Sequence, residues 1–143
     1  MACKVLVVGA GTAAGYFVDE LAATQREVLA KEGAVVVVGE EPVAPYERPA
    51  LSKGYLFPPP RPEDEGGKKP ARLPGFHTTV GGGGAAHDEA WYAQNNVKLV
   101  MGTRVTAVDL NKRVATLLTL ATGATSTLTF EHLVVATGQN ERR

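Results

Sequence analysis

The first forty residues hold two apolar runs separated by a stretch of helical spacing. Residues 4–8 form one run, and Ala34–Val38 form a second that is rich in β-branched valine; both are typical of strands buried on two faces of a parallel sheet. Between them, apolar residues recur at the spacing of one helix face: Ala14, Phe17, Val18, Leu21 and Ala22. The pattern predicts a β-α-β unit with a right-handed crossover.

The middle of the chain has a different pattern. Residues 42–80 are rich in proline, which is incompatible with helix interiors and central strands. One short helix is predicted at Ala50–Leu56, because Pro49 fits the first position of a helix. We expect a surface loop over residues 58–70 and a flexible turn at Gly81–Gly84.

The last third of the chain returns to regular alternation. A short helix, in which Trp91 and Tyr92 are expected to serve packing, is predicted at Glu89–Asn96, and a third parallel strand follows at Val97–Met101. Later runs, separated by turn residues, predict an antiparallel β-meander and a final buried strand: Val105–Leu110, Val114–Leu120, Ser126–Phe130 and Leu133–Ala136. The expected fold class is α/β, a Rossmann-like parallel sheet with a β-meander.

Length and charge exclude several classes of protein. The chain has 143 residues, enough for one core, and its 15 Lys and Arg balance 15 Asp and Glu, so it lacks the positive charge of a typical nucleic-acid binder. Its longest apolar run, Ala34–Val38, is far shorter than a membrane span. The sequence enters its first strand directly after the opening residues, without a leader pattern, so a cytoplasmic protein is expected.

The use of cysteine and histidine argues against dithiol and metal chemistry. The single cysteine, Cys3, excludes an internal disulfide, a paired redox motif and a cysteine-rich zinc site. We interpret it as a structural or exposed free thiol. The three histidines, His77, His87 and His132, lack the spacing of metal ligands, so no metal site is predicted.

The clearest chemical signal is the glycine-rich turn between the first strand and the helix. Gly9 permits a tight turn, Gly11 leaves space for a pyrophosphate beside the backbone, and Ala14 allows close helix–strand packing. The helix N-terminus that follows offers unpaired N–H groups and a partial positive charge to phosphates. We interpret the turn as a dinucleotide-binding fingerprint; the alternative is a glycine turn in an unrelated α/β domain.

An acidic pair follows the second strand. Glu40 and Glu41 come directly after Gly39, and a carboxylate at this place accepts hydrogen bonds from the two hydroxyls of an adenosine ribose. Glu41 lies 30 positions after Gly11, more than the ~20 of the usual fingerprint. A longer helix–strand connection over Gln25–Gly33 would absorb the difference. The alternative is a pair of surface glutamates, and the fingerprint alone does not distinguish FAD from NAD.

Longer blocks of the sequence resemble one family of flavoproteins. Glu41–Phe57, which includes Pro-Tyr-Glu-Arg-Pro, resembles the segment after the second strand in plant and algal monodehydroascorbate reductases. Further blocks continue the resemblance in the same order: Ala71–His77, Val80–Gly84, Trp91 and Tyr92. Leu133–Gly138 resembles the second flavin motif of the wider FAD-dependent reductases. The Pro-Tyr-Glu-Arg-Pro block is shared in looser form with ferredoxin-reductase-type flavoproteins, whereas Leu73–His77 is more particular to the ascorbate enzymes.

The resemblance implies FAD as the bound cofactor and NADH or NADPH as the co-substrate. It implies contacts to the pyrophosphate from the glycine turn and from the second flavin motif: Gly9, Ala10, Gly11, Thr12, Ala13, Ala136, Thr137 and Gly138. Glu41 would bind the adenosine ribose and Arg48 the phosphate–ribose region. Lys53 would lie near the isoalloxazine, where a cation stabilises the charge of the reduced flavin. The backbone at Arg104 or Val105 would border the adenine; without the family, Arg48 and Lys53 are ordinary surface cations.

The resemblance also implies a domain organisation and a reaction. Residues 1–143 correspond to the N-terminal part of an FAD-binding domain, ending after the Ala-Thr-Gly motif. The NAD-binding and interface domains are expected to be absent, the FAD/NAD(P)-binding fold incomplete, and the chain alone inactive, with no catalytic residue of its own. The complete family reduces a small-molecule redox substrate, the monodehydroascorbate radical, with NAD(P)H and, in this chain, without a dithiol relay. The alternatives are the FAD domain of a ferredoxin-type reductase and a non-catalytic FAD- or adenine-nucleotide-binding module.

Overall fold

The computed structural model of the chain describes residues 1–46, 48, 76–79 and 83–139. Within them the chain forms a six-stranded sheet, in the order β5-β2-β1-β8-β7-β6, and a separate hairpin of β3 and β4. The elements follow one another along the chain in this order: β1 (Ala2–Val8), α1 (Thr12–Thr24), the 3-10 helix η1 (Arg26–Leu29), β2 (Val35–Val38), β3 (Phe76–Thr79), β4 (Gly83–His87), α2 (Glu89–Gln94), β5 (Val97–Val100), β6 (Thr103–Asp109), β7 (Val114–Thr119) and β8 (Thr125–Val135).

Four of the six strands are parallel and form the centre of the fold. β1 pairs in parallel with β2 on one side and with β8 on the other, and β5 extends the sheet beyond β2. Every residue of β2 is buried, as expected for a valine-rich strand covered on both faces. The predicted β-α-β unit and the third parallel strand are confirmed.

The alternation of side chains along β1 is interrupted at one point. The N–H groups of Lys4 and Val5 both donate to the carbonyl oxygen of Ala34, at 2.8 and 2.9 Å. Two successive N–H groups that share one acceptor are typical of a β-bulge, which changes the face that the following side chains reach. As a result Cys3 and Leu6 pack on one face of the sheet, whereas Val5 packs on the other.

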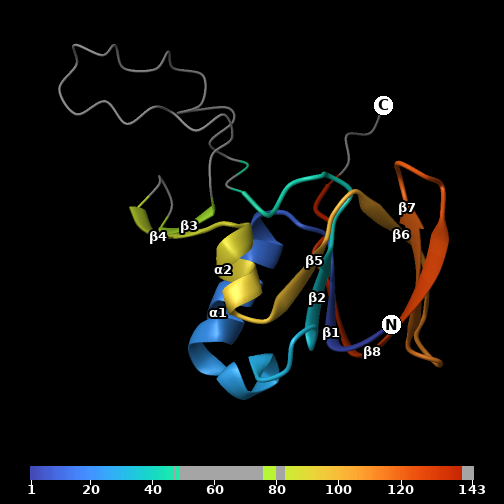
Figure 1. Cartoon of the computed structure of the whole chain (residues 1–143), viewed down its shortest axis with the longest axis horizontal. Helices are drawn as coiled ribbons and strands as arrows, with labels where there is room; N and C mark the ends of the chain where they lie inside the picture. Colours follow the sequence, from blue (N-terminus) through green and yellow to red (C-terminus); the bar gives the residue numbers. More distant parts are fainter. Residues whose placement is uncertain (47, 49–75, 80–82, 140–143) are drawn as a thin grey trace, which may run out of the picture.

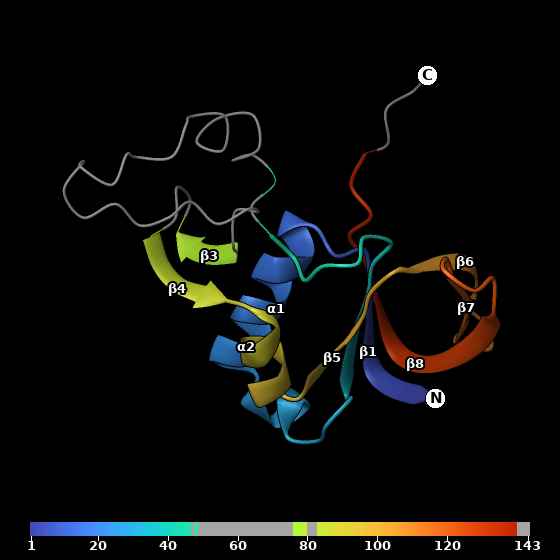
Figure 2. The ribbon, with the colours of Figure 1, turned by 45° about the horizontal axis from the view of Figure 1, so that its top comes forward.

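Two different layers cover the faces of the parallel strands (Figure 1). The helices α1 and α2 lie on one side and the antiparallel strands β6 and β7 on the other, as Figure 2 shows after rotation. The helix-side core consists of Val5, Val7, Ala10, Ala14, Val18, Ala22, Leu29, Val35, Val37, Tyr92 and Val97. The meander-side core consists of Cys3, Leu6, Val36, Val38, Ala115, Leu117, Leu128 and Phe130. The predicted Rossmann-like sheet with a meander is therefore confirmed.

The longest strand, β8, corrects the prediction of two separate strands at Ser126–Phe130 and Leu133–Ala136. Its first residues pair with β7, and from Thr129 onwards it pairs with β1, so one continuous strand belongs to both parts of the sheet. The polar residues Glu131 and His132 interrupt the apolar pattern but are exposed, and an extended strand tolerates exposed polar residues without a break. The end of the strand is also less buried than predicted, with Val135 exposed.

The second correction concerns Gly81–Gly84, predicted to be a flexible turn. Gly83 and Gly84 begin β4, which pairs with β3 in an antiparallel hairpin. Pairing of this kind is made by backbone groups, so a glycine run does not prevent it. Gly81 and Gly82, together with the predicted helix at Ala50–Leu56 and the predicted loop at 58–70, lie outside the described residues.

The connection between α1 and β2 is longer than usual, as predicted from the spacing of the fingerprint. It contains η1 and ends at Gly33, whose φ of +72° favours glycine. The side-chain amide of Asn96 donates to the carbonyl oxygen of Leu29 at 2.8 Å, which ties this connection to the turn after α2. Helix α2 itself begins after Asp88, whose carboxylate accepts from the N–H of Trp91 at 2.9 Å.

Candidate functional site

The four parallel strands end at one edge of the sheet. In the register of the sheet Val8, Val38, Val100 and Val135 are neighbours, so the residues that follow them meet at this edge. In open parallel sheets ligands bind outside the carboxyl ends of the strands. The glycine turn, the acidic pair and the second flavin motif all begin there.

The glycine turn is fixed directly against the second flavin motif. Gly9 has a φ of +105°, and its N–H donates to the carbonyl oxygen of Val38 at 2.8 Å. A Cβ on Gly9 would lie 2.2 Å from the carbonyl oxygen of Ala136 and 3.0 Å from the Cα of Thr137. The N–H of Ala136 in turn donates to the carbonyl oxygen of Val8 at 2.8 Å. Two segments that lie far apart in the sequence therefore approach backbone to backbone.

Helix α1 begins at the turn without a side-chain cap. Gly11 is its N-cap residue, and neither a capping side chain nor an acidic residue in the first turn satisfies the free N–H groups. Ala10 is buried, and its Cβ would be 2.5 Å from a Cβ on Gly39, so both positions require small residues. Thr12 and Ala13 form the first turn, which presents N–H donors and the positive end of the helix dipole at the sheet edge.

The second acid after β2, Glu41, is held by two side chains. Its Oε2 accepts a hydrogen bond from the hydroxyl of Tyr46 at 2.7 Å, and its Oε1 forms an ion pair with Arg48. Tyr46 is buried, and burial together with the hydrogen bond to the Glu41 carboxylate raises the pKa of its phenol. The guanidinium of Arg48 lies 5.3 Å from the centre of the Tyr46 ring.

The first acid, Glu40, pairs with the start of β6. Arg104 donates from Nε and Nη2 to the two carboxylate oxygens of Glu40, at 3.0 and 2.9 Å. This hydrogen bond raises the pKa of the Arg104 guanidinium. The N–H of Thr103 donates to the carbonyl oxygen of Gly39 at 2.8 Å, which holds Arg104 and Val105 beside the acidic pair.

The structure thus brings most of the predicted site residues to one edge: the glycine turn, Glu41, Arg48, the start of β6 and the residues after β8. Lys53 lies outside the described residues. Tyr46 is the site residue that sequence reasoning missed, although it belongs to the Pro-Tyr-Glu-Arg-Pro block. A spacing of five residues between an acid and a tyrosine does not indicate that the two side chains are in contact. The structure shows the contact, because the segment after β2 folds back and places Tyr46 against Glu41.

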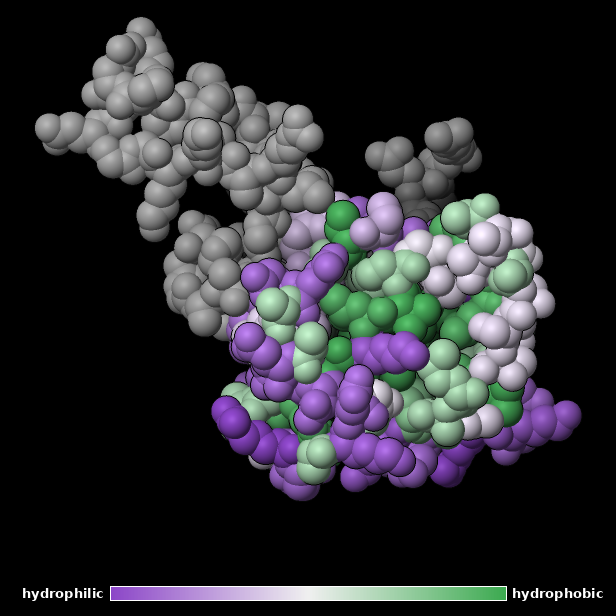
Figure 3. Space-filling view, viewed as in Figure 1, coloured by the Kyte–Doolittle hydropathy of each residue, from purple (hydrophilic) through white to green (hydrophobic). Residues whose placement is uncertain are grey.

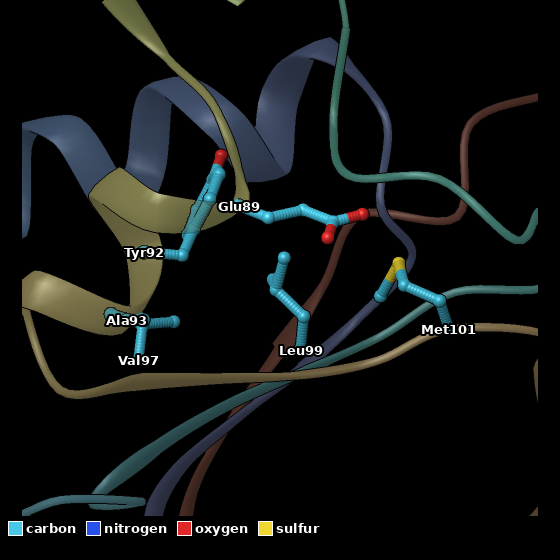
Figure 4. Close-up of a pocket in the computed structure, with 6 residues that line it drawn as sticks. All are labelled: Glu89, Tyr92, Ala93, Val97, Leu99 and Met101. Carbon is cyan, nitrogen blue, oxygen red and sulfur yellow. The ribbon is translucent and has the colours of Figure 1, made fainter.

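A pocket of about 270 Å³ opens beside the site, between α2 and β5, and is lined by Glu89, Tyr92, Ala93, Val97, Leu99 and Met101. Figure 4 shows the Glu89 carboxylate pointing along the pocket toward Met101 and the Tyr92 ring forming one wall. In Figure 3 hydrophobic side chains gather over β5, with hydrophilic ones beside them on the side of α2 and below. Met101 lines the pocket and also borders the site: a Cβ placed on Gly39 would lie 3.3 Å from the Cε of Met101.

Cys3 is a buried structural thiol. It lies in the meander-side core, and burial, followed by repulsion from Glu131, raises the pKa of its thiol from 9.0 to about 11. At neutral pH the group is therefore a thiol and not a nucleophilic thiolate. Among the residues that the structure describes, no group of three or more His, Cys, Asp or Glu could hold a metal ion.

We expect Cys3 to react slowly with iodoacetamide in the folded chain. At pH 8 a pKa of about 11 instead of 9.0 lowers the thiolate fraction about 100-fold, and burial slows the reaction further. The rate, followed by mass spectrometry, should rise with pH up to about 11 and should rise strongly when urea unfolds the chain. Equal rates in native buffer and in urea would show that the thiol is accessible.

Comparison with known proteins gives the family. The model of the family described as pyridine nucleotide-disulphide oxidoreductase matches residues 3–143. The chain belongs to the pyridine nucleotide-disulphide oxidoreductase family. The FAD cofactor and NAD(P)H co-substrate predicted from the sequence are those of this family.

Several relatives are monodehydroascorbate reductases. The chain is 46% identical to monodehydroascorbate reductase 2, peroxisomal, of Oryza sativa subsp. japonica and 41% identical to monodehydroascorbate reductase 4, peroxisomal, of Arabidopsis thaliana. Each alignment covers 93% of this chain and 24% of the relative, so the chain spans about a quarter of the length of these relatives. The resemblance to monodehydroascorbate reductases that the sequence motifs indicate is confirmed.

Solved structures agree on the fold. NADH:rubredoxin oxidoreductase from Clostridium acetobutylicum superimposes with a TM-score of 0.63 at 23% identity, covering 100% of this chain and 30% of that chain. A chain in the covalent putidaredoxin reductase–putidaredoxin complex gives a TM-score of 0.63 at 28% identity, covering 99% of this chain and 27% of that chain. None of the described helices is long and apolar enough to cross a membrane. The relatives' names include peroxisomal, cytosolic and chloroplastic forms, so their likeness does not fix a compartment.

Proposed function

We propose that this chain binds FAD as the N-terminal part of an NAD(P)H-dependent monodehydroascorbate reductase. The observation that carries the proposal is the backbone approach of Gly9 to Ala136, which joins the glycine fingerprint and the second flavin motif at one sheet edge. Identity of 46% to a monodehydroascorbate reductase over 93% of the chain supports the choice of reaction. The proposed substrate is the monodehydroascorbate radical, and the reductant is NADH or NADPH.

The residues of the edge fit the adenosine diphosphate half of FAD. The N–H groups at Ala10–Ala13 would donate to the pyrophosphate, and the residues Ala136–Gly138 would border it. Glu41 would accept from the ribose hydroxyls, with Arg48 beside the phosphates. The backbone at Arg104 and Val105 would border the adenine. Bound FAD would supply the redox chemistry, and we assign these residues to binding and orientation, with Lys53 proposed from the sequence alone to lie near the isoalloxazine.

One alternative has an observation in its favour. The likeness to the putidaredoxin reductase chain, at 28% identity, suggests the FAD domain of a ferredoxin-type reductase. The identity to the rice monodehydroascorbate reductase is higher, at 46%. A non-catalytic FAD- or adenine-nucleotide-binding module would use the same edge, and flavin absorbance separates FAD binding from binding of adenosine alone.

Gly11→Val is expected to abolish FAD binding while the chain stays folded. Gly11 has a φ of −93°, which any residue adopts, and a Cβ there would meet the flexible side chain of Arg48, whose Nε is 3.4 Å away. The valine side chain would occupy the space of the pyrophosphate. FAD binding is measured by titration with the cofactor and by flavin absorbance of the desalted protein, and folding by circular dichroism.

Ala23→Val provides the matched control, since Ala23 is exposed near the other end of the same helix. It should bind FAD as the wild type does. Unchanged FAD binding by folded Gly11→Val would contradict the proposed site at the glycine turn. Failure of the wild type to bind FAD would contradict the proposed function itself.

A further inference from the structure

Arg48 lies between the two parts of the proposed site. Its Nη2 forms the ion pair with Oε1 of Glu41, while its Nε lies 3.4 Å from the position of a Cβ on Gly11. One guanidinium therefore contacts the acid proposed for the ribose and also stands beside the turn proposed for the pyrophosphate. A ligand that fills both positions must meet this side chain.

Both carboxylate oxygens of Glu41 have partners within the protein. Tyr46 donates to Oε2 at 2.7 Å, and Arg48 pairs with Oε1. Each carboxylate oxygen has two lone pairs, so Oε2 can accept from Tyr46 and from one ribose hydroxyl at the same time. At Oε1 the second hydroxyl competes with a charged guanidinium, which binds a carboxylate more strongly than a neutral donor does. Tyr46 is buried, so Arg48 is the partner that can leave.

The ion pair is suited to exchange. The side chains of Arg48 and Glu41 are 48% and 39% exposed, and an ion pair with this access to water contributes little stability. A diphosphate carries more negative charge than a carboxylate and accepts two parallel hydrogen bonds from a guanidinium. Phosphate beside Gly11 would thus attract Arg48 more strongly than Glu41 does.

We propose that Arg48 couples phosphate recognition to ribose recognition in this site. Without ligand the guanidinium covers Oε1 of Glu41; a diphosphate at the glycine turn takes it away and leaves Oε1 to the ribose. This exchange rests on the proposed binding of FAD and adds a preference to it. The site binds nucleoside diphosphates more tightly than nucleosides, because adenosine has no phosphate to draw Arg48 away from Glu41. Coupling of this kind is a thermodynamic property of the two subsites and is measured through affinities.

The test compares adenosine and ADP on the full 143-residue chain, with affinities from NMR titration for adenosine and calorimetry for ADP. In Arg48→Gln the affinity for ADP should fall about 10-fold or more, whereas the affinity for adenosine should rise about 3-fold or more, because Oε1 of Glu41 is then free. The two ligands change in opposite directions. An Arg48 that served merely to hold Glu41 in place would weaken both ligands when removed.

Two further variants complete the experiment. In the Glu41→Gln background, Arg48→Gln should give no gain in adenosine affinity, as a double-mutant cycle requires if the gain acts through Glu41. Lys112→Gln removes one positive charge at a distant hairpin and should change neither affinity. Adenosine binding that is unchanged, weaker or undetectable in Arg48→Gln, with ADP bound by the wild type, overturns the exchange alone. A wild type that binds neither ADP nor FAD overturns the proposed function with it.

Discussion

Replacing Gly9 with alanine is expected to lower the free energy of unfolding by about 2–5 kcal/mol, the sum of overpacking and of a side chain at positive φ. A Cβ at this position would lie 2.2 Å from the carbonyl oxygen of Ala136, which is backbone and cannot move aside without displacing the end of β8. The φ of +105° adds strain for any residue with a side chain. Urea unfolding followed by circular dichroism measures the loss, and FAD binding should be lost with it.

Gly123→Ala is the matched control for this variant. Gly123 also has a positive φ, of +71°, but nothing lies within 4 Å of a Cβ placed there. Gly123→Ala should therefore lower the free energy of unfolding by about 1–2 kcal/mol, which is the cost of a side chain at positive φ without any overpacking. Equal losses in the two variants would show that the close approach of Gly9 to Ala136 does not govern stability at the sheet edge.

The second large effect concerns turnover. We expect the 143-residue chain, saturated with FAD, to oxidise NADH or NADPH at least about 10³-fold more slowly than a full-length monodehydroascorbate reductase, because hydride transfer needs a nicotinamide held within ~3–3.5 Å of the flavin. The sequence contains a single glycine fingerprint of the strand–turn–helix type, and the proposed FAD site uses it. The chain also spans about a quarter of the length of its relatives.

The assay measures NADH oxidation with an artificial electron acceptor and excess free FAD. The full-length rice relative, at 46% identity over the shared part, is the positive control, and free FAD without protein gives the background. Rates comparable with those of the relative would mean that residues 1–143 already hold a nicotinamide. The assignment of these residues to cofactor binding alone would then be wrong.

Much of the fold could be predicted from the sequence because the parallel strands are strongly patterned. Valine runs covered on both faces, such as β2, and the helix face of α1 depend on local periodicity, and the structure confirms both. The prediction of two strands in place of β8 is wrong, because a period-two pattern carries no information about which partner a strand has. Its polar residues Glu131 and His132 lie just after Thr129, where the strand passes from β7 to β1, and they are exposed without interrupting the strand.

In the candidate site, too, the sequence predicts the residues that depend on local pattern and misses those that depend on the fold. Gly9 and Gly11 could be predicted because they form a glycine pattern between a strand and a helix, which is a local property of the sequence. The role of Tyr46 and the pairing of Arg104 with Glu40 could not, because they depend on where chain segments return in space. The pairing of Arg48 with Glu41 could not be predicted either. The sequence predicts that the two residues bind neighbouring parts of one ligand, but their contact with each other carries no sequence signal.

The position of β1 between β2 and β8 has a consequence for how the chain acquires its structure. β1 is the first of the described strands along the chain, and one of its two neighbours, β8, is the last of them; Val5 pairs with His132. Contacts between residues so distant in sequence close slowly, because a long loop must be ordered before they form. The centre of the sheet, and with it the carboxyl edge where Gly9 meets Ala136, can therefore be completed only after β8 has been synthesised, so the two halves of the proposed nucleotide site cannot meet before then.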